Sequence, residues 1–274
     1  MKSFLKKALI GSAGFALFSS SAMAAWTFSD PDLVIGFQAL AGQGSTTNLF
    51  FNAGNSYNFA NGTGSSGLIG NINDDLVATY GASWNTRTDL YFGVIGNRSN
   101  LSPGSPTFET GIPGVSDPGR TVYVSAAATT VGGAALRPQF GSSTLGNGAS
   151  KYAGLRTNLP GFSETVFGDG VASLNQTTQP VAWNNGWTFW NATPGAAFGV
   201  MTGGIQQKFG QAGTNNIVDI QRMVASTPSV YVGSFIISDN GNITAISAVP
   251  ETSSSVLAIA IATAGTFRRR RNRA

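Results

Sequence analysis

The sequence contains no cysteine and no histidine in 274 residues. Without cysteine the chain has no disulfide, no thiolate metal ligand and no thiol nucleophile. Without histidine it lacks the commonest general base, the Ser-His-Asp triad and the usual zinc ligand sets. A chain of this length can bury a core that is large enough without disulfides, so an exported protein of this size would not need them.

Charge is also scarce, since Asp, Glu, Lys and Arg make up 10% of the chain. The formal net charge of +4 is misleading, because three lysines lie in the first seven residues and five arginines in the last seven. The stretch 25–252 keeps eight basic residues against twelve acidic ones, a net charge of −4. It has no basic stripe with interleaved aromatic residues, so we expect no binding of nucleic acid.

The first 24 residues have the three parts of a secretory signal peptide. The lysines form a basic start, and the apolar run from Ala8 to Phe18 is too short to span a bilayer. Small residues at Ala22 and Ala24 predict cleavage after Ala24. We therefore expect export by Sec-type machinery and signal peptidase, with an uncleaved membrane anchor as the alternative.

The last 26 residues also have three parts: a short motif, an apolar span and an arginine cluster. Ser253–Phe267 is uncharged and would span about 22 Å as a helix, which is less than a hydrocarbon core of about 30 Å. It could cross with local thinning of the bilayer, and the arginines would hold its end on the cytoplasmic side. The motif is Val249, Pro250, Glu251 and Thr252, and the basic stop is Arg268, Arg269, Arg270, Arg271 and Arg273.

This order of parts resembles the PEP-CTERM sorting signal of Gram-negative bacteria that make exopolysaccharide. The family motif reads Val-Pro-Glu-Pro, and Thr252 stands here in place of the last proline. The resemblance covers residues 249–274. It implies recognition by an exosortase, which is a membrane cysteine transpeptidase, then removal of the tail and transfer to an extracellular acceptor. A simple tail anchor is the alternative.

The body, residues 25–248, is rich in Gly, Ser, Thr and Asn and still carries many Phe, Val, Ile and Trp residues. This balance is typical of a folded β-rich domain with tight turns. We expect an all-β fold, an antiparallel β-sandwich or β-roll with long Gly/Ser/Asn/Pro loops, between an N-terminal signal helix and a C-terminal membrane helix. The expected strands are 32–37, 48–52, 90–96, 121–124, 218–224, 229–238 and 243–246.

Turn residues refine this expectation. Asn240-Gly241 predicts a hairpin with positive φ at both positions, and residues 181–190 are a second hairpin candidate. One short helix is expected over 73–80, with Asn73 as its N-cap and Gly81 closing it. Residues 101–119 hold four prolines and read as a long surface loop.

Carboxylates are the strong acid–base groups that remain. A glycosidase would need two of them about 5 to 10 Å apart, and no pair is marked by its sequence context. Asn71-x-Asn73-x-Asp75 looks like the start of a calcium loop, but Leu76 replaces the required glycine and Ala82 the final glutamate, so an EF-hand is rejected. The glycine-rich stretch 62–67 lacks the lysine of a phosphate loop. The candidate carboxylates are Asp74, Asp75, Asp89, Glu109, Asp117, Glu164 and Asp169.

Three tryptophans lie close together at Trp183, Trp187 and Trp190. They could form a stacking platform for sugar rings, or they could fill the core of a β-hairpin, as aromatic residues commonly do. The core interpretation is favoured, and the cluster is still the best ligand-site candidate in the sequence.

Two processing signals around a body without a catalytic constellation predict a non-enzymatic, exported protein. We expect it to bind the inner membrane transiently and then to reside at the cell surface or in the extracellular matrix, with no cofactor or metal. A carbohydrate-binding module for exopolysaccharide is the alternative. A glycan hydrolase with two carboxylates is the third hypothesis.

Overall fold

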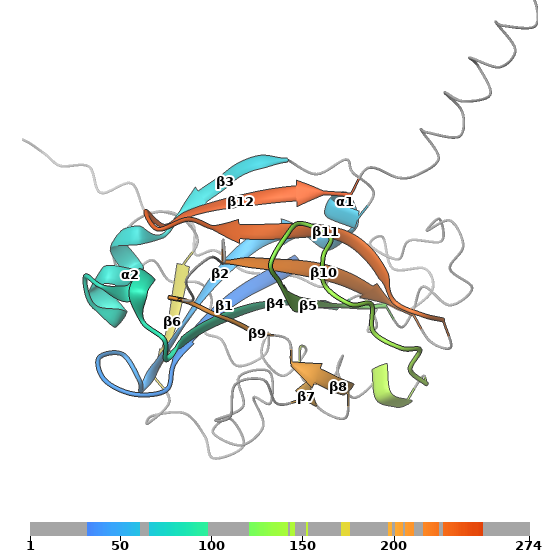
Figure 1. Cartoon of the computed structure of the whole chain (residues 1–274), viewed down its shortest axis with the longest axis horizontal. Helices are drawn as coiled ribbons and strands as arrows, with labels where there is room; N and C mark the ends of the chain where they lie inside the picture. Colours follow the sequence, from blue (N-terminus) through green and yellow to red (C-terminus); the bar gives the residue numbers. More distant parts are fainter. Residues whose placement is uncertain are drawn as a thin grey trace, which may run out of the picture.

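A computed structural model of the chain shows long antiparallel strands in one curved sheet, with short helices near its ends (Figure 1). It describes residues 32–60, 66–97, 121–141, 143–145, 152, 171–175, 197–198, 201–204, 206–210, 216–224 and 227–248. Throughout this part of the chain the strand pairs are antiparallel. The expectation of a mostly antiparallel β protein with few helices is therefore confirmed.

The strands are β1 (Asp32–Ala39), β2 (Thr47–Asn55), β3 (Gly67–Asn71), β4 (Leu90–Asn97), β5 (Val122–Ala128), β6 (Val171–Asn175), β7 (Ala197–Phe198), β8 (Met201–Gly204), β9 (Gln206–Lys208), β10 (Ile217–Met223), β11 (Val230–Ile237) and β12 (Asn242–Ser247). The helices are α1 (Ser56–Ala60), α2 (Asn73–Tyr80) and the 3₁₀ turn η1 (Trp84–Thr86). All seven expected strands are present, each with at least one bound shifted by one to four residues.

The main sheet has ten strands in the order β3-β12-β11-β10-β5-β4-β1-β2-β6, with β9 paired to β4, while β7 and β8 form a small separate ladder. The sheet curls until its two edges, at β3 and at β2 and β6, nearly meet. A Cβ atom added to Gly70 of β3 would lie 2.7 Å from the ring of Phe51 in β2. A bare glycine backbone therefore lets that ring pack across the gap.

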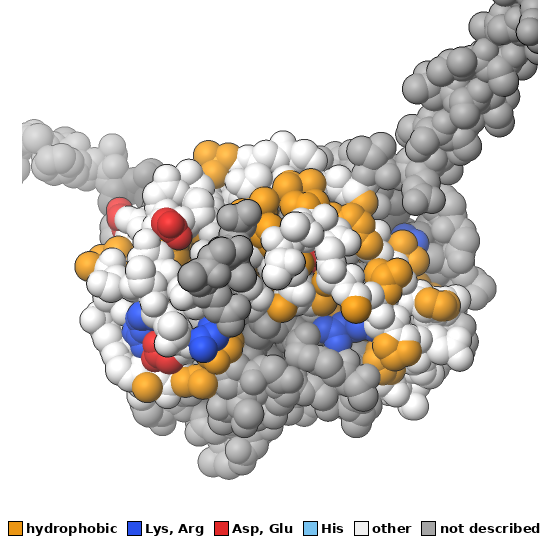
Figure 2. Space-filling model, in the orientation of Figure 1, with side chains coloured by type: hydrophobic (Ala, Val, Ile, Leu, Met, Phe, Trp, Pro, Cys, Tyr) orange, Lys and Arg blue, Asp and Glu red, His pale blue; other side chains and the backbone are white. Residues whose placement is uncertain are grey.

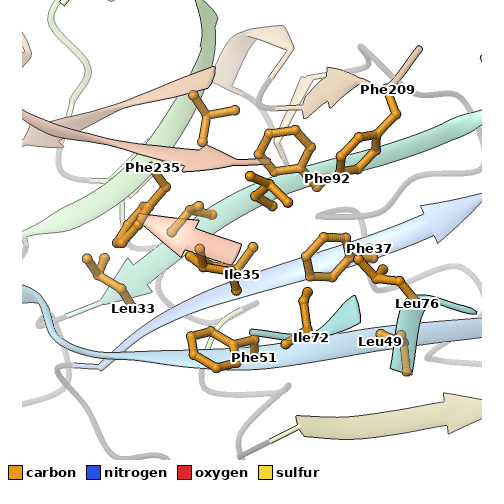
Figure 3. Close-up of a cluster of buried hydrophobic side chains, with 14 of the residues drawn as sticks. Leu33, Ile35, Phe37, Leu49, Phe51, Ile72, Leu76, Phe92, Phe209 and Phe235 are labelled. Atoms are coloured by element: carbon orange, nitrogen blue, oxygen red, sulfur yellow. The ribbon is translucent and has the colours of Figure 1, made fainter. Parts of the chain in front are cut away.

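The concave face holds the main hydrophobic core, because alternate residues of each strand point to the same side. Leu33, Ile35 and Phe37 of β1 are fully buried there. Figure 3 shows Phe37, Phe92 and Phe209 packed side by side. Their ring centroids lie 6.2 Å apart for Phe37 and Phe92 and 4.8 Å apart for Phe92 and Phe209.

The opposite face is buried as well. Val34, Phe50 and Ile95 alternate with the core residues and are at most 1% exposed. Tyr152 is also buried, and its hydroxyl donates to the Asp32 carbonyl oxygen at 2.6 Å. The chain between β5 and β6 thus reaches the start of β1. Burial on both faces explains why strands such as Asp32–Ala39 read as continuous apolar runs.

The β11–β12 hairpin turns at the expected place with a different geometry. Gly241 has φ of 77°. Among the described residues other than glycine, Asn216 alone has a positive φ, so the prediction of a positive φ at Asn240 is wrong. The Gly241 N–H donates to the Ser238 carbonyl oxygen at 2.9 Å. The Ser238 N–H also donates to the Asn242 carbonyl oxygen at 3.0 Å, so residues 239–241 form a three-residue loop in which glycine alone takes the left-handed position.

Helix α2 has the expected bounds, but Asn73 is its first residue and not its cap. Position Ile72 precedes it without a side-chain cap bond, and Asn71 Oδ1 accepts the Asn73 N–H at 2.9 Å. Gly81 follows the helix with φ of 92°, as expected, and its N–H bonds to the Val77 carbonyl oxygen. The side chain of Tyr80 joins the helix to the sheet, since its hydroxyl donates to the Phe37 carbonyl oxygen at 2.8 Å.

Some expectations concern other parts of the chain. The signal helix, the membrane helix, the hairpin over 181–190 and the loop over 101–119 lie outside the described residues. Helix α1, the turn η1 and strands β3, β6, β7, β8 and β9 were not expected from the sequence.

Candidate functional site

The face of β10 that points away from the core carries two buried polar side chains, Asp219 and Gln221, which are 1% and 0% exposed. Residues 129–141, which we call the strap, follow β5 and run back over this face, because their backbone bonds to both side chains. These bonds join positions more than 80 residues apart in the sequence.

Asp219 is the acceptor at the centre of this cluster. The Gly132 N–H donates to its Oδ1 at 3.0 Å, and the Ala134 N–H donates to its Oδ2 at 2.8 Å. The Ser234 hydroxyl of β11 donates to Oδ1 at 2.6 Å. Hydrogen bonds to an ionised carboxylate are stronger than neutral ones, so three of them fix the start of the strap firmly.

Gln221 fixes the next part of the strap. Its Oε1 accepts the Arg137 N–H at 3.0 Å, and its Nε2 donates to the Ala135 carbonyl oxygen at 2.8 Å. Arg137 is itself buried, its Nη2 donates to the Ser125 carbonyl oxygen at 2.9 Å, and burial lowers the pKa of its guanidinium. The strap therefore carries a cation, Arg137, that is held inside the protein.

Tyr231 borders the same cluster. Its hydroxyl lies 2.9 Å from Ser234 Oγ. Burial raises the pKa of Tyr231, and the nearby charge of Asp219 raises it further. The cluster is a hydrogen-bonded structural anchor, because the carboxylate is enclosed and both of its oxygens accept hydrogen bonds from the protein's own donors.

A second polar centre surrounds Arg87, which follows η1. Its Nε and Nη2 bond to the two oxygens of Asp89 at 3.0 and 2.7 Å, a bidentate ion pair. Its Nη1 donates to the carbonyl oxygens of Tyr80 and Gln43, and its Nη2 also reaches that of Ala41. One guanidinium thus joins the end of α2, the β1–β2 loop and the start of β4.

This ion pair predicts a pH dependence of stability. The hydrogen bond from Arg87 lowers the pKa of Asp89, so the folded state takes up this proton at lower pH than the unfolded state. The stabilisation is then complete above the ordinary aspartate pKa near 4 and disappears as the pH falls through the folded value. Urea unfolding of wild type and Asp89→Asn from neutral to acidic pH should show a shallower acid slope in the variant. Parallel slopes would contradict the assignment.

The structure places three of the candidate carboxylates. Asp74 and Asp75 lie in the first turn of α2, where negative charge is favourable, and Asp89 pairs with Arg87. Asp219, the most enclosed carboxylate of the described chain, was not singled out from the sequence. The others, Glu109, Asp117, Glu164 and Asp169, lie outside the described residues, as do Trp183, Trp187, Trp190 and every residue of the two sorting signals predicted from the sequence.

The segment that looked like a calcium loop has a structural role. Asn71 Nδ2 donates to Asn242 Oδ1 at 2.6 Å, and Trp84 Nε1 donates to Asn73 Oδ1 at 3.3 Å. These amides join the start of α2 to the β11–β12 turn and to η1. Within the described ranges, no three Asp, Glu, His or Cys side chains gather closely enough to hold a metal ion. Nor does any helix in the described part have the length and apolarity of a membrane span.

Comparison with known proteins adds no further assignment. The sequence matches no family model, no curated protein and no solved structure.

Proposed function

We propose that the protein is exported and then sorted by an exosortase, which removes the C-terminal signal and leaves the body at the cell surface or in the extracellular matrix. The observation that carries the proposal is the order of parts in residues 249–274, combined with an N-terminal secretory signal. The short apolar span provides a temporary membrane anchor, and the arginines stop its passage through the bilayer.

The place where the sheet ends supports this route. Strand β12 finishes at Ser247, and the Ala248 N–H still donates to the Val232 carbonyl oxygen at 3.0 Å. The motif begins at the next residue, Val249. A cut inside or after the motif would leave every β12 ladder bond intact, so the body can fold before the tail is removed.

The fold of the body is proposed to be a β-roll and not a sandwich of two sheets. Its long strands belong to one continuous sheet that curls towards closure, and the separate ladder of β7 and β8 is small. A roll of this kind suits an extracellular structural or binding role, because it presents loops at both ends of the strands.

Deletion of Arg268–Ala274 tests the proposal. Without the basic stop, the tail should no longer be held in the membrane for processing, and the precursor should keep its motif. Intact-mass measurement of the exported protein reports both cuts at once: wild type should lack residues 1–24 and the tail, and the variant should keep the rest of the tail. The matched control replaces the five arginines by lysines, which keeps the charge and should keep processing. An unchanged mature C-terminus in the deletion variant would refute the proposal.

Binding of exopolysaccharide is the alternative, and it depends on Trp183, Trp187 and Trp190. The third hypothesis, a glycan hydrolase, gains no support from Asp89 or Asp219, because an ion pair holds the first and protein donors surround the second.

A further inference from the structure

A chain of hydrogen bonds in the strap cluster leads from a partly exposed phenol to a buried carboxylate. Ser234 has one hydroxyl proton, which it donates to Asp219 Oδ1 at 2.6 Å. The Tyr231 hydroxyl, 2.9 Å from Ser234 Oγ, is therefore the donor of the second bond. The phenol proton of Tyr231 is thus connected through one serine to Asp219, which is 1% exposed.

Tyr231 is the end of this chain of bonds that other molecules can reach. Among the described tyrosine side chains, Tyr91 and Tyr231 are partly exposed and the others are at most 2% exposed. A Cβ atom added to Gly132 of the strap would lie 3.6 Å from Tyr231 Cζ and 3.7 Å from its Cε1. Because residue 132 is a glycine, the strap places no side chain from this position over Cε1, the ring carbon next to the one that carries the hydroxyl.

The chain of bonds matters for oxidation of the phenol. A tyrosine that loses an electron becomes a strong acid, so the electron leaves more readily when a hydrogen-bonded base accepts the proton in the same step. Burial raises the pKa of Tyr231, and the charge of Asp219 raises it further, so the phenol keeps its proton at neutral pH. Ser234 and Asp219 supply the acceptor that this proton needs, and the N–H groups of Gly132 and Ala134 hold the carboxylate in place.

The sequence offers few competing sites for an oxidant. Cysteine, whose thiolate reacts readily with peroxide, is absent from the whole chain. Tyr91 is the natural comparison, because among the described residues its hydroxyl has no such chain of bonds to a buried carboxylate. Tyr231 is therefore the described tyrosine that combines access from outside with an internal acceptor for its proton.

Little charge surrounds this cluster. Figure 1 shows the strap as a green loop that crosses in front of β10 and β11. In the same orientation, Figure 2 shows polar and hydrophobic side chains with few charged ones over these strands. Charged residues make up 10% of the chain, so two copies can bring these faces together without strong repulsion.

We propose that Tyr231 is an oxidative cross-linking site at which a haem peroxidase, using hydrogen peroxide, joins two copies of the chain through a dityrosine bond. The peroxidase removes one electron from each of two Tyr231 phenols, and each phenol proton moves through Ser234 to Asp219. The two radicals form a carbon–carbon bond between ring carbons next to the hydroxyl-bearing ones. Each of these ring carbons then loses its proton to solvent, and the stored proton returns to the phenol oxygen. The two electrons and the two released protons reduce one hydrogen peroxide to two molecules of water.

The inference rests on the proposed function in one respect. A protein held at the cell surface or in the extracellular matrix stays beside other copies, and a chain without cysteine cannot join them by disulfides. A dityrosine bond is a covalent link that does not depend on thiols. The link lies on the body of the protein, so it survives removal of the C-terminal signal.

Peroxidase treatment of the full-length chain in neutral detergent tests the proposal. Covalent dimer is measured on a denaturing gel, dityrosine by its fluorescence, and the joined residues by peptide mass mapping. Wild type should form a dimer joined at Tyr231, and Tyr231→Phe should form several-fold less. Tyr91→Phe is the matched control at the other partly exposed ring and should cross-link like wild type. Undiminished dimer in Tyr231→Phe would overturn the proposal.

Ser234→Ala tests the path of the proton, because it removes the serine hydroxyl and keeps the phenol. The initial rate of cross-linking at Tyr231 should fall several-fold, while oxidation of Tyr91 in the same sample stays unchanged. Ser234→Thr restores a hydroxyl and should restore most of the rate, and urea unfolding checks that each variant is folded. An equal rate in Ser234→Ala and wild type would also overturn the proposal.

These outcomes are independent of the sorting route. The assay needs no exosortase, so its failure leaves the proposed route standing. Failure of the Arg268–Ala274 deletion test would remove the route, and the reaction at Tyr231 could still be measured on the purified chain.

Discussion

Replacement of Asp219 by alanine is expected to lower the free energy of unfolding by about 4 kcal/mol, because it removes the acceptor of three buried hydrogen bonds. Each buried donor left without a partner costs about 1 to 3 kcal/mol. Gly132 and Ala134 would also lose the group that holds the strap on β10. The remaining bonds of the strap, to Gln221, Ser125 and Ser229, hold residues 135–137 and leave its first half unprotected.

The measurement combines urea unfolding with hydrogen exchange at the amides of Gly132 and Ala134. Exchange at both amides should accelerate in Asp219→Ala by more than global destabilisation explains. Asp219→Asn keeps the shape and one acceptor oxygen, so its loss should be smaller, about 2 kcal/mol. Asp239→Asn makes the same change at an exposed turn position and should stay within about 0.5 kcal/mol of wild type. Equal effects of Asp219→Asn and Asp239→Asn would show that the carboxylate anchors nothing.

Strands with strong local signals were predictable. In β4 and β11, apolar and β-branched residues run for the length of a strand, and Gly241 marks the turn after β11. Residues 73–80 also predict a helix, since two acidic residues lie in its first turn and a glycine follows it. In the structure that glycine, Gly81, has the positive φ typical of a helix end. In each case the relevant interactions join residues close in sequence, which composition and period can report.

Strand β3 shows what local pattern cannot supply. Its five residues include two glycines and an asparagine, a composition that favours a turn. It is a strand because β12 offers a free edge and because Gly70 leaves room for the ring of Phe51 from β2. Both causes come from segments distant in sequence.

The hydrogen bonds from the strap to Asp219 and Gln221 could not be predicted from the sequence, for a related reason. In β10, Val218 and Ile220 alternate with Asp219 and Gln221, and in a strand with one solvated face the polar residues would point to water. Here both faces are covered, so the buried polar residues Asp219 and Gln221 mark where another segment packs on the strand. Their partners lie more than 80 residues away, and no spacing rule connects them.

The proposed sorting signals differ from the strap in this respect. Each consists of adjacent residues, and we propose that each acts through a membrane or an enzyme that reads an extended chain. A signal of that kind can be recognised from the sequence before any fold is known. A ligand site on the body depends on side chains that folding brings together, which is why the sequence yields a route for this protein more readily than an activity.

The aromatic core provides the second large prediction. Phe209 follows the three-residue strand β9, is fully buried and stacks among Phe37, Phe92 and Trp84, whose centroids lie 4.8 to 6.3 Å from its own. Truncation to alanine leaves a cavity that the surrounding rings cannot fill, and should cost about 4 kcal/mol. Since β9 pairs with β4 over three residues, we expect this side chain to contribute much of its attachment to the sheet.

Phe209→Ala should therefore unfold at lower urea concentration and lose protection of the β9 amides even below the main transition. Phe209→Leu restores most of the volume without the ring contacts, and should cost about 1.5 kcal/mol while keeping β9 attached. Leu40→Ala, at a position 43% exposed, is the matched truncation outside the core and should cost less than about 1 kcal/mol. If β9 stayed protected in Phe209→Ala, the strand would be held by its ladder bonds, and the ring would contribute to the core alone.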